Sequence, residues 1–174
     1  MAENNPKANT AERVLTLTRV FDSPRDLVFD AWTKREHLMN WFGPKGFKML
    51  STTLDLRPGG VFHYGMQAPD GSVMWGKWTF REVKRPERLV VVVSFSDEAG
   101  GTTRHPYSAS WPLETLSTTS FAEQGGKTVM TLKWEAINAT GEERKTFDSS
   151  HEGMKTGWGG TLDQLEHYLA KVQP

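Results

Sequence analysis

The hexapeptide Asp55-Leu56-Arg57-Pro58-Gly59-Gly60 sets the course of the first half of the chain, because it reverses direction between two strand-like runs. Proline fixes one backbone angle of such a turn, and glycine tolerates the positive φ values that other residues avoid. We expect Asp55 and Arg57 to interact here. Turn chemistry is a sufficient explanation for the motif, and a buried Arg–Asp pair inside a pocket is the alternative interpretation.

The segment before this turn predicts one strand and two short helices. Residues 12–21 alternate with period two, so one face of a strand is available for burial. Ser23 and Pro24 then match the N-cap and the first position of a helix, which carries an apolar face ending at Trp32. A second short helix is expected from about Arg35 to Trp41.

The segment after the turn, residues 47–135, is broken by proline and glycine turns into roughly six more strands. Two prolines in residues 102–112 remove hydrogen-bond donors, so we expect a loop or an edge segment there. The apolar run 89–93 indicates a strand that is covered on both faces, lies at a subunit interface, or is central in the sheet.

The last helix is the second deciding feature. Thr140 and Glu143 have capping-box spacing, and a helical pattern then continues nearly to the end of the chain. Within it, Gly153, Gly157 and Gly160 fall on one side. Each interior glycine costs about 1 kcal/mol relative to alanine. Either the helix backbone approaches the sheet closely, or the glycines leave space for a ligand.

These elements predict an α+β helix-grip fold. We expect a curved antiparallel sheet of about seven strands around a long C-terminal helix, with two short helices after the first strand. The polar residues 1–10 are expected to form a flexible tail, and residues 11–172 a single domain.

Composition excludes several classes of function. Lys plus Arg and Asp plus Glu are 21 each, so the formal net charge is zero and gives no overall attraction to nucleic acid. The absence of cysteine excludes disulfides and fits a reducing compartment, so cytoplasmic localisation is expected. Neither a signal peptide nor an apolar stretch of about 20 residues is present, so we expect no stable membrane insertion.

Catalytic and metal-binding motifs are also missing. The five histidines are widely spaced and lack the pairing typical of a metal site, so we expect no metal and no cofactor. The strand beginning at Gly60 turns Phe62, Tyr64 and Met66 to one side, and this aromatic face is either ordinary core or part of a pocket wall. Tyr64 is the member best able to orient a ligand.

Several short sequence motifs occur in an order that resembles that of bacterial Aha1-like proteins of the SRPBCC (START/Bet v 1-like) superfamily. They are residues 24–33, residues 41–44, the turn at 55–60, residues 76–89, residues 126–128 and the closing Gly157-Trp158. The resemblance covers residues 11–169 and implies a container fold with a cavity. The eukaryotic namesake stimulates the Hsp90 ATPase with two domains, of which this chain has one.

Three hypotheses follow. The first is binding of a small hydrophobic or amphipathic molecule between the sheet and the last helix. The expected wall residues are Trp32, Tyr64, Trp78, Met154, Gly157 and Trp158. The second is a cavity enzyme of the cyclase, hydrolase or isomerase type, for which no paired acid and base is seen. The third is a protein-interaction module, directed to Hsp90 or forming a homodimer.

Overall fold

One antiparallel sheet forms the body of the protein, as the sequence predicts. In the computed structural model, which describes residues 13–173, its strands follow the order β1-β8-β7-β5-β4-β3-β2, and the short β6 pairs with β5. The strands are β1 Leu15–Phe21, β2 Lys48–Leu54, β3 Val61–Gln67, β4 Val73–Lys84, β5 Arg88–Ser96, β6 Thr102–Thr103, β7 Glu114–Gln124 and β8 Lys127–Ile137. The two-residue β6 is the one addition to the expected seven strands. The expected tail, residues 1–10, lies outside the described residues.

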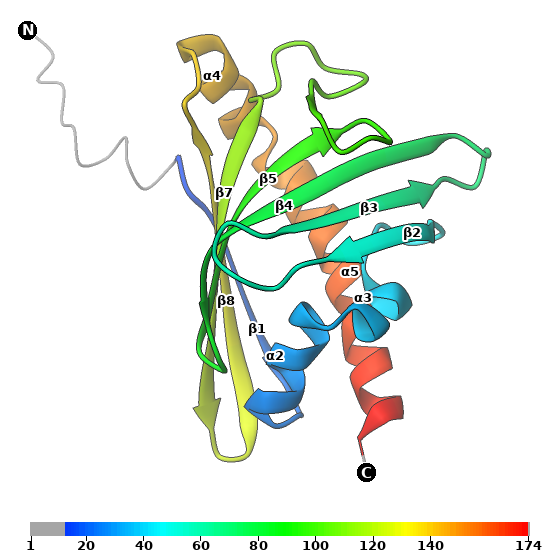
Figure 1. The fold of residues 1–174 in the computed structure, drawn as a ribbon. Helices are drawn as coiled ribbons and strands as arrows, with labels where there is room; N and C mark the ends of the chain where they lie inside the picture. Colours follow the sequence, from blue (N-terminus) through cyan, green and yellow to red (C-terminus); the bar gives the residue numbers. More distant parts are fainter. Residues whose placement is uncertain (1–12, 174) are drawn as a thin grey trace, which may run out of the picture.

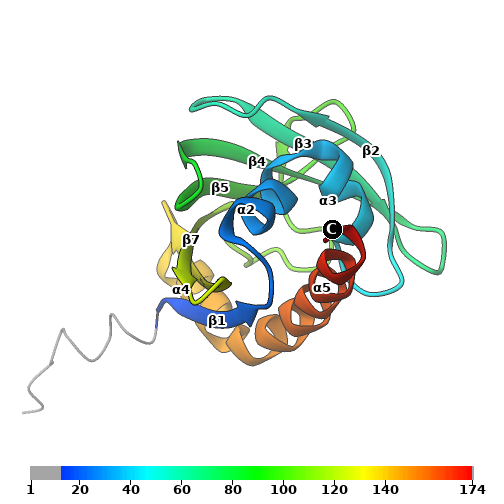
Figure 2. The same ribbon diagram turned by 90° about the horizontal axis from the view of Figure 1, so that it is seen from below.

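Four helices accompany the sheet: α2 Arg25–Thr33, α3 Arg35–Trp41, α4 Gly141–Ser149 and α5 His151–Val172. The sheet is strongly curved, and α5 runs along its open side (Figure 1). Seen from below, the strands form an arc around α2 and α3, while α5 closes the gap between the two ends of the arc (Figure 2). No helix of the described residues is long and apolar enough to cross a membrane.

The C-terminal helix differs from the sequence prediction, because it is interrupted at Ser150 instead of continuing from Thr140. The Ser150 hydroxyl donates a hydrogen bond to the Thr146 carbonyl at 2.7 Å. Such local bonds compete with the regular helical pattern. The expected capping box is present at the start of α4, between Thr140 and Glu143.

The first helix also begins one residue later than expected. Pro24 is its N-cap and has an extended conformation, with φ −62° and ψ 146°. Ser23 therefore does not cap the helix. Its hydroxyl accepts a hydrogen bond from the side chain of Gln173 instead.

The turn at residues 55–60 has the structural role that its composition predicts. Arg57 Nε lies 2.9 Å from Asp55 Oδ2, and both side chains are exposed. Gly59 has a φ of +84°. A side chain at Gly60 would collide with the Asp55 carbonyl group. The alternative of a buried ion pair inside a pocket is therefore wrong.

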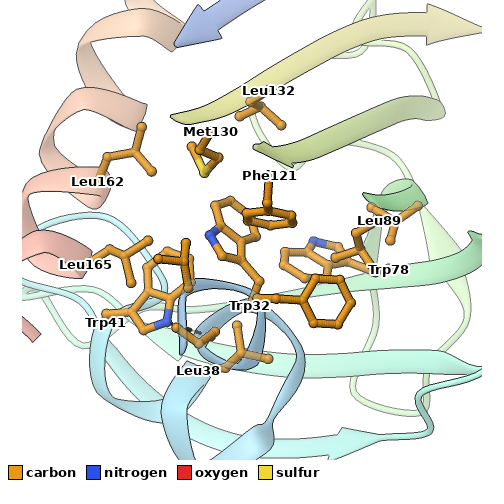
Figure 3. Packing of buried hydrophobic residues seen from close by; sticks show 14 of the residues in the cluster. Trp32, Leu38, Trp41, Trp78, Leu89, Phe121, Met130, Leu132, Leu162 and Leu165 are labelled. Carbon is orange, nitrogen blue, oxygen red and sulfur yellow. Dashed lines mark hydrogen bonds between the residues drawn. The ribbon is translucent and has the colours of Figure 1, made fainter. Parts of the chain in front are cut away.

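The core fills the space between the sheet, α2, α3 and the C-terminal half of α5. Trp32 lies at its centre, among Trp78, Phe121 and Met130 (Figure 3). Its ring stacks at 6.1 Å from Trp78 and at 6.0 Å from Trp158 of α5. The apolar run 89–93 belongs to β5, which lies between β4 and β7 and is therefore central.

Candidate functional site

A cavity of about 310 Å³ lies between the concave face of the sheet and the N-terminal half of α5. Strands β3, β4, β5, β7 and β8, the loop after α3 and the segment between β6 and β7 all contribute to its wall. Seven aromatic residues contribute to the lining: Phe42, Tyr64, Trp75, Phe95, Trp111, Trp134 and Trp158. Met66, Met74 and Met154 add flexible apolar surface.

Tyr64 owes its place in this wall to the glycine opposite it. Tyr64 of β3 pairs with Gly76 of β4. A Cβ atom built on Gly76 would stand 2.6 Å from the Tyr64 hydroxyl oxygen, so the phenol ring occupies the space where a side chain would be. Burial raises the pKa of Tyr64 far above its usual value, with a smaller opposing effect of Trp78, so the hydroxyl keeps its proton at physiological pH.

His105 reaches the cavity from the segment between β6 and β7. Its ring lies 4.5 Å from that of Phe95, centroid to centroid. The Tyr107 backbone N–H donates to His105 Nδ1 at 3.0 Å, so the neutral ring carries its proton on Nε2. Burial lowers the pKa of His105, which favours this neutral form. His105 therefore presents one N–H donor and no charge near pH 7.

A smaller hollow of about 60 Å³ lies deeper in the fold. It shares five wall residues with the larger cavity: Phe42, Tyr64, Val93, Trp134 and Trp158. Trp32, Trp78, Ser117 and Thr119 line only the hollow. The two spaces are therefore neighbours that share part of their wall.

The sequence-predicted wall residues divide between the two spaces. Tyr64 and Trp158 line both of them, while Met154 and Gly157 line only the larger cavity. Trp32 and Trp78 border only the inner hollow and otherwise pack in the core. The indole N–H of Trp32 is buried and has no hydrogen-bond partner within residues 13–173.

The glycines of α5 leave open space. In the part of the chain that the structure describes, a Cβ atom added to Gly153, Gly157 or Gly160 would meet no atom within 4 Å outside its own helical neighbourhood. A close approach of the helix backbone to the sheet is therefore not the reason for these glycines. Of the three, Gly157 borders the cavity.

Sequence reasoning missed several residues of the wall. His105 and Trp111 lie in a segment that was expected only to be a loop or an edge. Trp134 of β8 also belongs to the wall, where its indole N–H donates to Thr115 Oγ1 at 2.6 Å. Ser117 and Thr119 were not singled out at all, because neither belongs to a recognisable motif.

The chemistry of both spaces is neutral. Within the described residues, no Asp, Glu, Lys or Arg lines either the cavity or the hollow. Residues 13–173 also contain no group of three His, Asp or Glu side chains that could hold a metal ion. The polar groups present can orient a neutral molecule by hydrogen bonds, but they include no carboxylate to act as a base.

A family model described as Activator of Hsp90 ATPase homolog 1-like protein matches residues 22–170. The chain belongs to this family. A comparison with curated proteins gave no match.

Solved structures of bacterial proteins share the fold of this Aha1-like chain. A crystal structure of a Nitrosomonas europaea protein is 30% identical, with a TM-score of 0.72, and the match covers 94% of this chain and 97% of that one. A Mycobacterium smegmatis protein is 23% identical, with a TM-score of 0.73 and coverage of 94% and 92%. The solution structure of an Arthrobacter aurescens protein has 24% identity, a TM-score of 0.76 and coverage of 92% and 88%.

Proposed function

We propose that the protein binds a small neutral molecule, mostly apolar, in the cavity between the sheet and α5. The observation that carries this proposal is a cavity of about 310 Å³ whose wall is aromatic and methionine-rich and, within the described residues, contains no Asp, Glu, Lys or Arg. Transfer of an unpaired charge into such a space is strongly unfavourable, whereas apolar surface is stabilised there.

The volume sets the size of the ligand. An apolar protein cavity of about 150 Å³ accommodates benzene. A cavity of 310 Å³ is about twice as large and therefore suits about 12 non-hydrogen atoms. Tyr64 and His105 supply hydrogen-bond donors at the wall, so the ligand can carry an acceptor atom without an unfavourable loss of hydration.

Binding is favoured over catalysis because the wall lacks a complementary acid and base. Tyr64 stays protonated, His105 Nδ1 already accepts the Tyr107 backbone N–H, and within residues 13–173 no carboxylate reaches the cavity to accept a proton. The co-chaperone and homodimer hypotheses have no comparable feature in the described residues to support them.

The test uses 1-aminonaphthalene, a fluorescent probe that is neutral at pH 7 and close in size to the expected ligand, with about 11 non-hydrogen atoms, and two matched leucine variants. Gly157→Leu places a side chain in the open space at the cavity wall, and Gly153→Leu makes the same change outside the wall. We expect the wild type and Gly153→Leu to bind the probe alike, and Gly157→Leu to bind at least about tenfold more weakly while its circular dichroism is unchanged. Failure of the wild type to bind, or equal binding by all three proteins, would contradict the proposal.

Native mass spectrometry of freshly purified protein complements this test. A stoichiometric adduct that is released on denaturation would identify the natural ligand class. We expect the adduct to be absent from Gly157→Leu and retained by Gly153→Leu.

A further inference from the structure

The wall of the inner hollow includes two buried residues that carry hydroxyl groups. In β7, Thr115, Ser117, Thr119 and Phe121 alternate toward the buried face of the sheet. Ser117 is 8% exposed and Thr119 is 2% exposed, and both line the hollow. Two hydroxyl-bearing residues on a buried wall otherwise built from aromatic and aliphatic side chains need a physical explanation.

Their neighbour Thr115 shows how a hydroxyl at this face can be satisfied. Thr115 Oγ1 accepts a hydrogen bond from Trp134 Nε1 at 2.6 Å and donates to the Val93 carbonyl at 3.4 Å. By contrast, within residues 13–173 the hydroxyls of Ser117 and Thr119 make no side-chain hydrogen bond, and neither oxygen is one of the fully buried atoms that lack a partner, so both are accessible from the hollow. A hydroxyl that a bound molecule shuts off from water without giving it a hydrogen bond weakens the binding of that molecule. A polar atom of that molecule in the hollow would prevent this loss.

The size and charge of the hollow restrict the group that can enter it. A volume of about 60 Å³ suits a single small group, such as a hydroxymethyl or a carbonyl, or about two water molecules at about 30 Å³ each. No charged side chain of the described residues lines the hollow, so an ionised carboxylate or ammonium would have no counter-charge. The group must therefore be neutral.

The hollow also adjoins the space assigned to the ligand. Tyr64, Trp158 and Trp134 are walls of both spaces. The larger cavity is dominated by apolar and aromatic side chains, whereas the hollow has hydroxyls on its wall. One molecule that extends from the cavity into the hollow would therefore meet apolar surface first and hydroxyls at its inner end.

We infer that the ligand is a neutral amphipathic molecule that binds with its polar end innermost, its hydroxyl or carbonyl group hydrogen-bonded to Ser117 and Thr119 and its apolar body in the larger cavity. This inference rests on the proposed function and adds the ligand's polarity and orientation. Ser117 and Thr119 are then specificity-determining residues: they discriminate between ligands that have a terminal polar group and ligands of the same shape that lack one.

The test pairs two probes of equal size, 3-phenyl-1-propanol and n-butylbenzene, which differ by a hydroxyl in place of a methyl group. Thr119→Val and Ser117→Ala remove one hydroxyl each with little change in volume. Thr118→Val makes the same change on the opposite, half-buried face of the strand and serves as the control. Dissociation constants are measured by quenching of tryptophan fluorescence or by calorimetry.

We expect Thr119→Val and Ser117→Ala each to raise the Kd of the alcohol about fivefold, which corresponds to the loss of one hydrogen bond of about 1 kcal/mol. The Kd of butylbenzene should stay within about twofold of its wild-type value or fall, and Thr118→Val should leave both unchanged.

An equal effect on both probes, or none on the alcohol, would overturn the inference. Those outcomes are also the ones expected if the hydroxyls merely hold water. Binding of butylbenzene with no variant-dependent discrimination would leave the proposed function intact and remove only the orientation. Failure of the wild type to bind either probe would instead overturn the proposed function, and the inference with it.

Discussion

The Tyr64 phenol lies across Gly76, its cross-strand partner, so that a Cβ atom on Gly76 would stand 2.6 Å from the hydroxyl oxygen and 2.6 Å from the ring carbon that bears it. The glycine thus leaves the space that the aromatic ring fills. The same arrangement recurs one residue along, where the Trp75 ring covers Gly65. Because side chains alternate along a strand, the Tyr64–Gly76 pair faces the cavity and the Trp75–Gly65 pair lies on the opposite face of the sheet.

Replacement of Gly76 by alanine should therefore destabilise the protein, although alanine is usually preferred to glycine in a strand. Alanine loses less backbone entropy on folding than glycine does, which favours the folded variant by about 0.5–1 kcal/mol. Overpacking of the added methyl group against the Tyr64 ring costs about 1–3 kcal/mol. We expect a net loss of about 1–2 kcal/mol in the free energy of unfolding, measured by urea denaturation.

A double-mutant cycle provides the control for Gly76. In a Tyr64→Ala background the ring is gone, so Gly76→Ala should become neutral or stabilising. An equal loss in both backgrounds would show that the alanine is unfavourable for a reason other than the phenol ring.

Replacement of the α5 glycines by alanine should have the opposite sign. Within residues 13–173, an added Cβ at Gly153, Gly157 or Gly160 would meet no atom within 4 Å outside its own helical neighbourhood, so alanine's higher helix propensity should be gained without a steric clash. Each substitution should raise the free energy of unfolding by about 0.5–1 kcal/mol. Thermal unfolding of the single variants and the triple variant tests this, and a loss of stability at any site would mean that the helix packs more closely there than the structure has it.

The fold could be predicted from the sequence because its strongest signals are local. The turn at residues 55–60 and the capping box at Thr140 act through residues within three or four positions of each other. The interruption at Ser150 escaped prediction because it depends on which acceptor a serine hydroxyl selects, and residue types alone do not determine that choice.

The candidate site could be predicted only in part. Tyr64 was found because β3 alternates clearly between large apolar and other residues. In β7 both faces carry small polar side chains, so alternation does not reveal that Ser117 and Thr119 point inward. His105 reaches the wall through a loop, and loop conformation depends on distant contacts that a periodic pattern does not record.

His105 should make stability depend on pH. Burial lowers the pKa of His105 below its ordinary value of about 6.5, so the folded state binds its proton less readily than the unfolded state does. The contribution of neutral His105 to the free energy of unfolding is therefore fully present above about pH 6.5 and is lost as the pH falls through the lower pKa of the folded state. NMR titration of the ring C–H signals checks the direction of the pKa shift.

His105→Asn is the matched variant for this titration. An Asn side-chain oxygen can accept the Tyr107 backbone N–H as Nδ1 does, but it does not titrate near neutral pH. The difference in unfolding free energy between pH 7.5 and pH 5.5 should be smaller in the variant than in the wild type. If the two proteins lose the same stability over this range, the dependence comes from other groups.

Thr140 should influence the cavity from outside it. Its hydroxyl accepts the Glu143 backbone N–H at 3.2 Å, and the Glu143 carboxylate accepts the Thr140 backbone N–H at 3.2 Å. The same carboxylate accepts from Arg104 at 2.9 Å, next to His105. Hydrogen bonds from the Thr140 backbone and from Arg104 lower the pKa of Glu143, so this contribution to stability is present above about pH 4.5 and is lost below it.

Thr140→Ala should therefore cost about 1 kcal/mol in urea denaturation and also shift the ring NMR signals of His105. The shift is expected because the cap orients Glu143, which holds Arg104 and with it the start of the segment that carries the histidine. Thr140→Ser keeps the hydroxyl and should preserve both stability and the His105 signals. If alanine and serine behave alike, the hydroxyl does not contribute. If alanine lowers stability but leaves the His105 signals unchanged, the cap stabilises α4 but does not affect the position of His105 in the cavity wall.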